Sequence, residues 1–372
     1  VAGSSGAGML TPFFMKAQGY SLALAGIPLF ANGLGRVSSD LMSGVLATYF
    51  SSGVLITAAV VSGLAFSILG VFFIDITAAF FSIWVVLGLT EALFALSIRK
   101  IAFDQSPPQR QGQVQGQVAT ALGIGFTLGP LLGGIVGKWF GPGSLFVLYA
   151  IPQLIGLILI LIGGAHRQRG VSKESSGSIW REGRKLLSNS AFRASCLSVF
   201  QSFLFLTGVT KVAFPFFVVN ARGFGLDIVG TLVAISRMTD TLGRYSGGWF
   251  CDRIKTRRVI LMGVGIGIPM FLVQTLGTHY ATLLIPLSIL TYGFGLSNVG
   301  CTTFGLQVAN QQARGLSLGL TRASTSLGNM LGPLFAGALV EELGYELSFQ
   351  AMAMISFAVL VIAWHGLKKE SN

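Results

Sequence analysis

Apolar residues form long runs along this chain, and short polar connections separate them. A helix needs roughly 20 apolar residues to cross about 30 Å of hydrocarbon. The pattern predicts twelve membrane-spanning helices, at residues 1–15, 22–47, 53–73, 77–99, 113–138, 143–164, 194–219, 227–251, 258–277, 281–305, 315–340 and 346–367. The first run is short, so we expect it to be the later part of a helix that is truncated at its N-terminus.

Most connections are very short, and helices joined so tightly are antiparallel neighbours. One connection is different. Residues 165–192 are polar, basic and rich in serine and glycine. This composition predicts a cytoplasmic linker between an N-terminal six-helix bundle, residues 1–164, and a C-terminal six-helix bundle, residues 193–372. Within the linker, residues 179–187 could form an amphipathic helix on an anionic membrane surface, or could be plain solvated chain.

A glycine and proline pattern occurs twice, and its two copies are 203 residues apart. The first copy is Gly116, Gly125, Gly129, Pro130, Gly133 and Gly134; the second is Gly319, Gly328, Gly332, Pro333 and Gly337, with Ala336 in the remaining place. An apolar chain that repeats itself in two halves is typical of transporters. We therefore predict an all-α polytopic membrane protein built from two pseudo-symmetric six-helix bundles.

The repeated pattern also has a mechanical interpretation. Pro130 and Pro333 each remove a backbone hydrogen bond and bend a helix. The neighbouring glycines recur every four residues, so they share one smooth face that another helix can approach closely. Such a face suits sliding between two moving bundles, although static close packing is the alternative.

Two motifs resemble those of the major facilitator superfamily, and in particular its drug or metabolite:proton antiporter branch. The first-half glycine and proline set matches the family's helix 5 motif, which is typical of antiporters. The connection after residue 251 resembles the family's loop signature through Gly248, Asp252 and Arg253. The resemblance implies secondary active transport by alternating access, with Asp252 facing the start of helix 5 near residues 111–114.

Composition supports the membrane interpretation and sets its orientation. Hydrophobic residues make up 52% of the chain and charged residues only 10%, whereas soluble proteins carry about 25% charged residues. The net charge of +12 lies mainly in connections. Because Lys and Arg accumulate in cytoplasmic loops, we predict a plasma (inner) membrane protein with both termini in the cytoplasm, and no nucleic acid partner.

Charged residues inside predicted spans are costly unless they are paired or hydrated, and they mark functional sites. They include Arg36, Asp40, Arg237, Asp240, Arg244 and Arg322. Arg36 and Asp40, like Asp240 and Arg244, are spaced i, i+4 and can meet on one helix face. We predict that an Asp40–Arg322 contact closes the cytoplasmic side, with structural pairing inside each helix as the alternative.

Glu91 is the only acidic residue in its predicted span. A carboxylate in a low-dielectric site binds a proton more readily than one in water, so Glu91 is the first candidate for proton coupling, followed by Asp40 and Asp240. The alternative is a structural partner for a nearby arginine.

Polar residues in the seventh and tenth spans are candidates for contact with substrate: Lys211, Gln201, Thr207, Tyr292, Asn298 and Thr302. Lys211 could bind an anionic group or extend toward the membrane surface. No nucleotide, metal or hydrolytic motif emerges, so we expect no enzyme activity and no cofactor. The sequence favours a monomeric, proton-coupled exporter of a small organic molecule; the alternative is uptake or facilitated transport of a small organic anion.

Overall fold

The computed structural model describes residues 2–74, 76–104, 111–163, 186–309 and 314–367. Most of the predicted linker lies outside these residues. The side chains of some helix ends, including Asp40 and Gly116, also lie outside the description. The elements that the structure describes are all helical.

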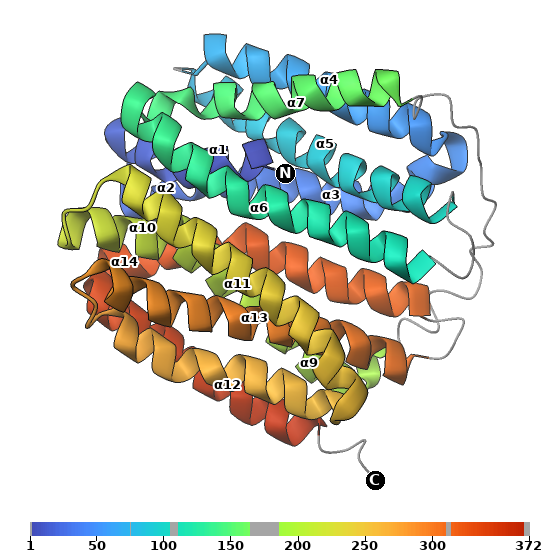
Figure 1. The fold of residues 1–372 in the computed structure, drawn as a ribbon, viewed down its shortest axis with the longest axis vertical. Coiled ribbons are helices and arrows are strands. Elements are labelled where there is room, and N and C mark those ends of the chain that lie inside the picture. The colour runs from blue at the N-terminus through green and yellow to red at the C-terminus, as the bar shows by residue number, and fades with distance from the viewer. Residues whose placement is uncertain (1, 75, 105–110, 164–185, 310–313, 368–372) are drawn as a thin grey trace. The chain divides into compact units, whose positions relative to one another are not determined.

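The chain divides into two compact units, which we call the first and second unit (Figure 1). The first contains residues 1–174 and 224–234, and the second contains residues 175–223 and 235–372. The helices of the first unit are α1 (Ala2–Ala17), the short α2 (Leu22–Ala25), α3 (Ile27–Tyr49), α4 (Ser52–Phe72), α5 (Thr77–Asp104), α6 (Gln111–Phe140) and α7 (Leu145–Ile162), with a 3₁₀ turn, η2 (Pro142–Ser144), before α7. These elements follow the first six predicted spans.

The second unit opens with a continuous helical stretch that changes its hydrogen-bonding pattern along its length. It consists of α9 (Ser190–Gly208), the π-helical η4 (Val209–Ala213), α10 (Phe214–Phe216) and the π-helical η5 (Phe217–Ala221). It is followed by α11 (Leu226–Arg253), whose first turns belong to the first unit, and then by α12 (Thr256–Gln274), α13 (Tyr280–Val308) and α14 (Arg314–Gly366). Gly344 has a φ of 75°, a left-handed conformation that favours glycine, and divides α14 into the last two predicted spans.

Helix boundaries follow from local chemistry. The side-chain oxygen of Ser51 accepts a hydrogen bond from the backbone of Val54 at the start of α4. Asn189 accepts two such bonds at the start of α9. Each satisfies backbone N–H groups that have no partner inside the helix, so the residue before each of these helices defines where it starts.

Eight described helices are long and apolar enough to cross a membrane, counting α14 once. Many of their large apolar side chains point outward, including Ile135, Ile155 and Ile162. Because such exposure is unfavourable in water and suits lipid, the outer faces fit a bilayer. Inside the first unit, Phe80, Trp84 and their aromatic neighbours form the core.

The repeated glycines mediate the same helix contact in both units. A Cβ atom on Gly6 of α1 would lie 2.6 Å from the Gly129 carbonyl oxygen, and one on Gly208 of α9 would lie 2.6 Å from the Gly332 carbonyl oxygen. These separations leave no room for any side chain, so α1 meets α6, and α9 meets α14, through backbone contact. The two copies of the pattern therefore pack alike, each inside its own unit.

Candidate substrate and proton sites

An ion pair joins two helices inside the first unit. Arg36 Nη1 of α3 lies 3.3 Å from Glu91 Oε2 of α5, and the Glu91 side chain is only 10% exposed. Gly35 and Gly88 hold these two helices in backbone contact beside the pair, because a Cβ atom on either would collide with the other helix. Packing thus holds the two helices that carry Arg36 and Glu91 close together.

Two further polar side chains lie beside the Glu91 carboxylate, those of Ser4 and Tyr149. The Tyr149 hydroxyl is buried and makes no hydrogen bond of standard geometry. A proton on Glu91 would turn the neutral ion pair into a single positive charge. Sequence reasoning did not predict Tyr149, because nothing in the pattern of its own helix marks it as a neighbour of Glu91.

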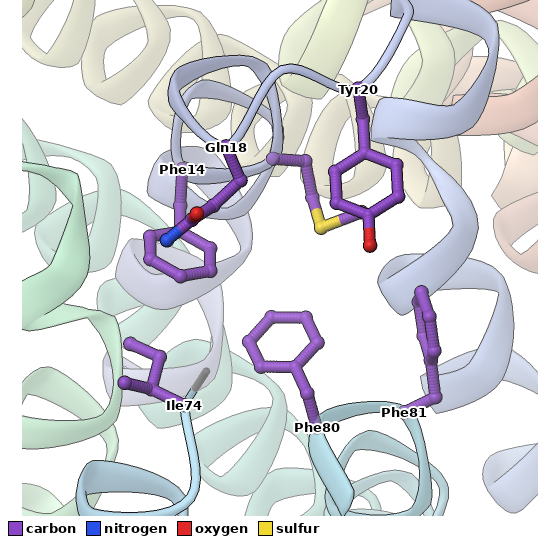
Figure 2. A pocket seen from close by; sticks show the side chains of 7 residues that line it. Phe14, Gln18, Tyr20, Ile74, Phe80 and Phe81 are labelled. Atoms are coloured by element: carbon purple, nitrogen blue, oxygen red, sulfur yellow. The ribbon is translucent and has the colours of Figure 1, made fainter. Parts of the chain in front are cut away.

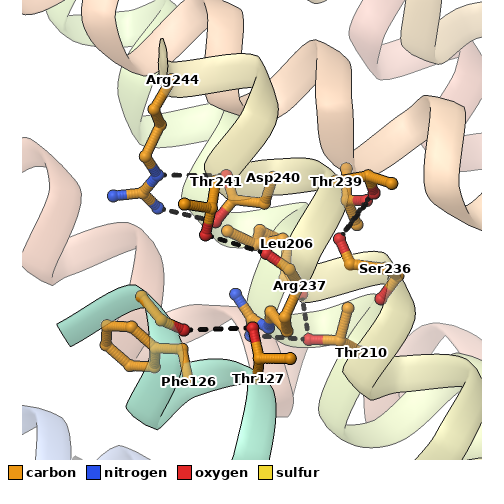
Figure 3. Close-up of polar contacts among 12 residues, drawn as sticks. Phe126, Thr127, Leu206, Thr210, Ser236, Arg237, Thr239, Asp240, Thr241 and Arg244 are labelled. Carbon is orange, nitrogen blue, oxygen red and sulfur yellow. Dashed lines mark hydrogen bonds and ion pairs between the residues drawn. The ribbon is translucent and has the colours of Figure 1, made fainter. Parts of the chain in front are cut away.

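Three charged positions of the second unit form a cluster on α11 (Figure 3). Asp240 accepts from Arg244 through both carboxylate oxygens, at 3.2 Å from Nε and 2.9 Å from Nη2. The expected i, i+4 contact is therefore present. Arg237 lies one turn away, 8% exposed, and donates from Nη2 to Thr210 Oγ1 at 2.9 Å. Its buried Nε has no acceptor in the part of the chain that the structure describes.

Thr210 and Lys211 belong to the π-helical segment η4. Gly6 and Gly208 occupy equivalent places in the glycine contact, as do Pro12 and Pro215 in the repeated Pro-Phe-Phe sequence, yet the offsets are 202 and 203. One additional residue therefore lies between Gly208 and Pro215. A π-helical turn, with its wider i→i+5 bonds, accommodates it, and such turns are frequent at functional sites.

The other predicted cavity residues are spread through the second unit. Gln201 is buried and donates to Ser356 of α14, and Thr207 donates to the Phe203 carbonyl of its own helix. Tyr292 bonds to Ser246, and Thr302 donates to the Asn298 carbonyl. These contacts do not gather the side chains at one point, so their role as substrate contacts stays a prediction.

The predicted gating residues are only partly visible. Arg322 is exposed on α14, and the side chain of its proposed partner Asp40 lies outside the described residues. Near the end of α11, Gly248 has open space around it, Asp252 is exposed, and Arg253 stacks 3.8 Å from the Trp249 ring. The predicted contact of Asp252 falls on side chains outside the description, so it stays a prediction.

The end of α6 contacts the start of α11 within the first unit. Lys138 Nζ lies 2.8 Å from Asp227 Oδ2, and a Cβ atom on Gly134 would lie 2.9 Å from the Gly230 Cα. Lys138 is in the last turn of α6 and Asp227 in the first turn of α11, so each charge also complements its helix dipole. We call these four residues the α6–α11 contact.

A pocket of about 180 Å³ opens where α1 ends and α5 begins (Figure 2). Its lining is mostly aromatic and includes no charged side chain: Phe14, Met15, Gln18, Tyr20, Ile74, Phe80 and Phe81. The pocket therefore has no part in the charged sites above. Among the described residues, no group of three or more His, Cys, Asp or Glu side chains could hold a metal ion.

Residues 1–320 match the family described as Major Facilitator Superfamily. The chain belongs to the Major Facilitator Superfamily. It is 26% identical over 117 residues to multidrug resistance protein 1 of Bacillus subtilis, which covers 31% of this chain and 29% of the relative. It is 27% identical over 145 residues to a cis,cis-muconate transport protein of Acinetobacter baylyi, which covers 37% of this chain and 34% of the relative. This superfamily member spans about a third of the length of the curated relatives it matches.

Solved structures of superfamily transporters share the fold over nearly the whole chain. The nucleoside transporter NupG matches with a TM-score of 0.75 and 16% identity, covering 99% of this chain and 96% of that one. A bacterial homologue of the human lysosomal transporter Spinster matches with a TM-score of 0.73 and 16% identity, covering 99% and 92%. The predicted all-helical fold is thereby confirmed. Membership in this superfamily makes the chain a multi-pass membrane protein.

Proposed function

We propose that this protein exports a small organic molecule across the plasma (inner) membrane by alternating access, in exchange for protons. Membership in the Major Facilitator Superfamily supports the proposal that the protein is a transporter. The observation that supports proton coupling is the Arg36–Glu91 ion pair, which links two helices of the first unit. The distance between Arg36 Nη1 and Glu91 Oε2 is 3.3 Å. An ionisable pair inside a membrane span is a recurrent element of proton pathways.

Protonation of Glu91 changes charge without requiring the two helices to separate. The backbone contacts at Gly35 and Gly88 keep α3 and α5 together, whereas Arg36 is 34% exposed and can turn to another partner once Glu91 is neutral. A conformation that offers Arg36 such a partner would be favoured by the proton. Coupling arises because protonation and conformation then depend on each other.

The direction of transport is supported by the helix 5 motif, which is typical of antiporters and lies on α6. Its glycines pack α6 against α1 and against the start of α11. The similarity to multidrug resistance protein 1 also favours export. With the positively charged connections inside, we place both termini in the cytoplasm.

A second candidate function is uptake or facilitated transport of a small organic anion. The α11 cluster favours it, because Arg237 and Arg244 carry two positive charges against the single negative charge of Asp240. The similarity to a cis,cis-muconate transport protein points the same way.

Proteoliposomes with imposed pH gradients test the proposal. Ethidium and benzenesulfonate are suitable probes, because their charge does not depend on pH and a gradient alone does not redistribute them. An acidic lumen drives antiport into the vesicle, and an alkaline lumen drives symport. We expect accumulation in the acidic lumen, its loss in Glu91→Gln, and its retention in Glu346→Gln, which alters an exposed glutamate.

The reverse polarity separates the two candidates. Accumulation of benzenesulfonate only in an alkaline lumen supports uptake of an anion. Transport that proceeds equally with and without a gradient contradicts proton coupling.

A further inference from the structure

Among the described charges of α11, Arg237 is a buried guanidinium whose hydrogen bonding is incomplete. Arg244 is 37% exposed at its side chain and is bound by Asp240. Arg237 is more than nine-tenths buried, and none of the described residues accepts a hydrogen bond from its Nε. Asp240 attracts it electrostatically, but both oxygens of that carboxylate accept from Arg244.

A buried guanidinium with an unsatisfied N–H group is unfavourable unless another acceptor is supplied. The neighbouring hydroxyl of Thr210 is neutral and occupies one terminal nitrogen. A carboxylate is the group that best complements a guanidinium with an unsatisfied N–H group, because it is an ionised acceptor whose hydrogen bonds to a guanidinium are charge-assisted.

The position of this guanidinium is specific to the second unit. At the offset of 204 that relates Gly44 to Gly248 and Arg36 to Asp240, the counterpart of Arg237 is Gly33. Its partner Thr210 lies in η4, the π-helical turn that the additional residue creates. The two features that distinguish this part of the second unit from its first-unit counterpart thus meet in one hydrogen bond (Figure 3).

We propose that Arg237, positioned by Thr210, binds the carboxylate of the transported molecule, so that the substrates are organic acids. This inference rests on the proposed function only in that the molecule bound is the one transported. Because the guanidinium is buried in this structure, binding requires a conformation in which the substrate can reach it.

Equilibrium binding in lipid nanodiscs, without any gradient, tests this site. Two matched pairs of probes differ only in charge: benzoate with benzamide, and adipate with adipamide. We expect at least one acid to bind and its amide to bind about tenfold more weakly or worse, because hydrogen bonds between charged groups contribute about twice as much as neutral ones.

Variants then assign the interaction to the guanidinium. Arg237→Met should weaken acid binding about tenfold or more and leave the weak amide binding unchanged. Arg237→Lys, which keeps the charge but not the planar fork, should fall between Arg237→Met and the wild type. Lys255→Met removes an exposed positive charge elsewhere and should bind as the wild type does.

Thr210→Val and Thr210→Ser keep the test decisive if Arg237→Met does not fold. The valine variant removes the partner of Nη2 and should weaken acid binding, and the serine variant should restore it. Equal binding of acid and amide, no acid binding in the millimolar range, or unchanged binding in the folded Arg237 and Thr210 variants would overturn the inference.

The experiments distinguish a failure of the proposed proton-coupled transport from a failure of the proposed acid site. If the wild type binds acids through Arg237 but shows no gradient-driven transport, the site stands and proton coupling does not. If Glu91→Gln abolishes gradient-driven accumulation while no acid binds, coupling stands and the acid site does not.

Discussion

The two units share their packing but differ in how their charges are connected. In both, glycine faces bring helices into backbone contact, at Gly6 with Gly129 and at Gly208 with Gly332. In the first unit an ion pair joins two helices, α3 and α5. In the described part of the second unit, the Asp240–Arg244 ion pair lies within one helix, α11, and an additional arginine, Arg237, lies beside it. The two units thus share their glycine-mediated helix contacts but differ in the charged side chains placed on those helices.

This difference indicates that the two units can have different functions in transport. A pair that links helices responds to a proton by changing the interaction between them. A cluster with excess positive charge responds to an anion. We therefore assign proton coupling to the first unit and recognition of the substrate's charge to the second.

The largest expected effect comes from removing the arginine of the first unit's ion pair, and the arginine of the second unit's pair supplies the comparison. Arg36→Met leaves Glu91 buried and unpaired, and should cost about 2–3 kcal/mol, less than the roughly 3–5 kcal/mol of a fully buried pair because Arg36 is partly exposed. Arg244→Met should cost about 1 kcal/mol or less, because Arg237 lies close enough to compensate Asp240. Melting temperatures of purified protein check the order; a larger loss for Arg244→Met would contradict it.

The shared glycine contacts should respond alike in both units. Gly129→Ala and Gly332→Ala each force a methyl group into the backbone of the facing helix, and overpacking of this kind costs about 1–3 kcal/mol. Gly319→Ala is a matched control on α14, since nothing lies within 4 Å of its added Cβ. It should leave the melting temperature unchanged or raise it slightly. Similar losses at Gly319 and Gly332 would show that close packing is not the cause.

The smallest effect is expected at the α6–α11 contact. Lys138 and Asp227 are 53% and 34% exposed at their side chains, and exposed ion pairs contribute about 0.2–1 kcal/mol. Lys138→Met should therefore change the melting temperature little. It should shift the conformational balance if this contact opens during transport, which is measurable as altered labelling of a cysteine introduced at Gly143, where nothing lies within 4 Å of an added Cβ atom. A large loss of stability would contradict this account of the pair.

Much of the fold followed from the sequence alone. The apolar runs located the helices because membrane spans must satisfy their backbone internally and present apolar side chains to lipid. The glycine pattern anticipated the close helix contacts, since only glycine permits them. Gly344, which separates the last two helices, fell between predicted spans.

The partners of the charged side chains were harder to predict from the sequence. The i, i+4 rule considers one helix at a time, so it suggested Asp40 as a partner for Arg36, and that contact stays a prediction. The structure places Glu91 of another helix beside Arg36, which fits the alternative of an arginine partner for Glu91 but could not be assigned from the sequence. The hydrogen bond between Arg237 and Thr210 also joins different helices. The additional residue in η4 becomes visible only once the glycine contacts show which positions are equivalent.

One measurement tests the division of tasks most directly. Glu91→Gln in proteoliposomes should lose the accumulation of probe that a pH gradient drives in the wild type, yet should keep one-for-one exchange of labelled for unlabelled probe in the absence of a gradient. Gradient-driven accumulation at the wild-type level in Glu91→Gln would contradict the assignment of proton coupling to the first unit.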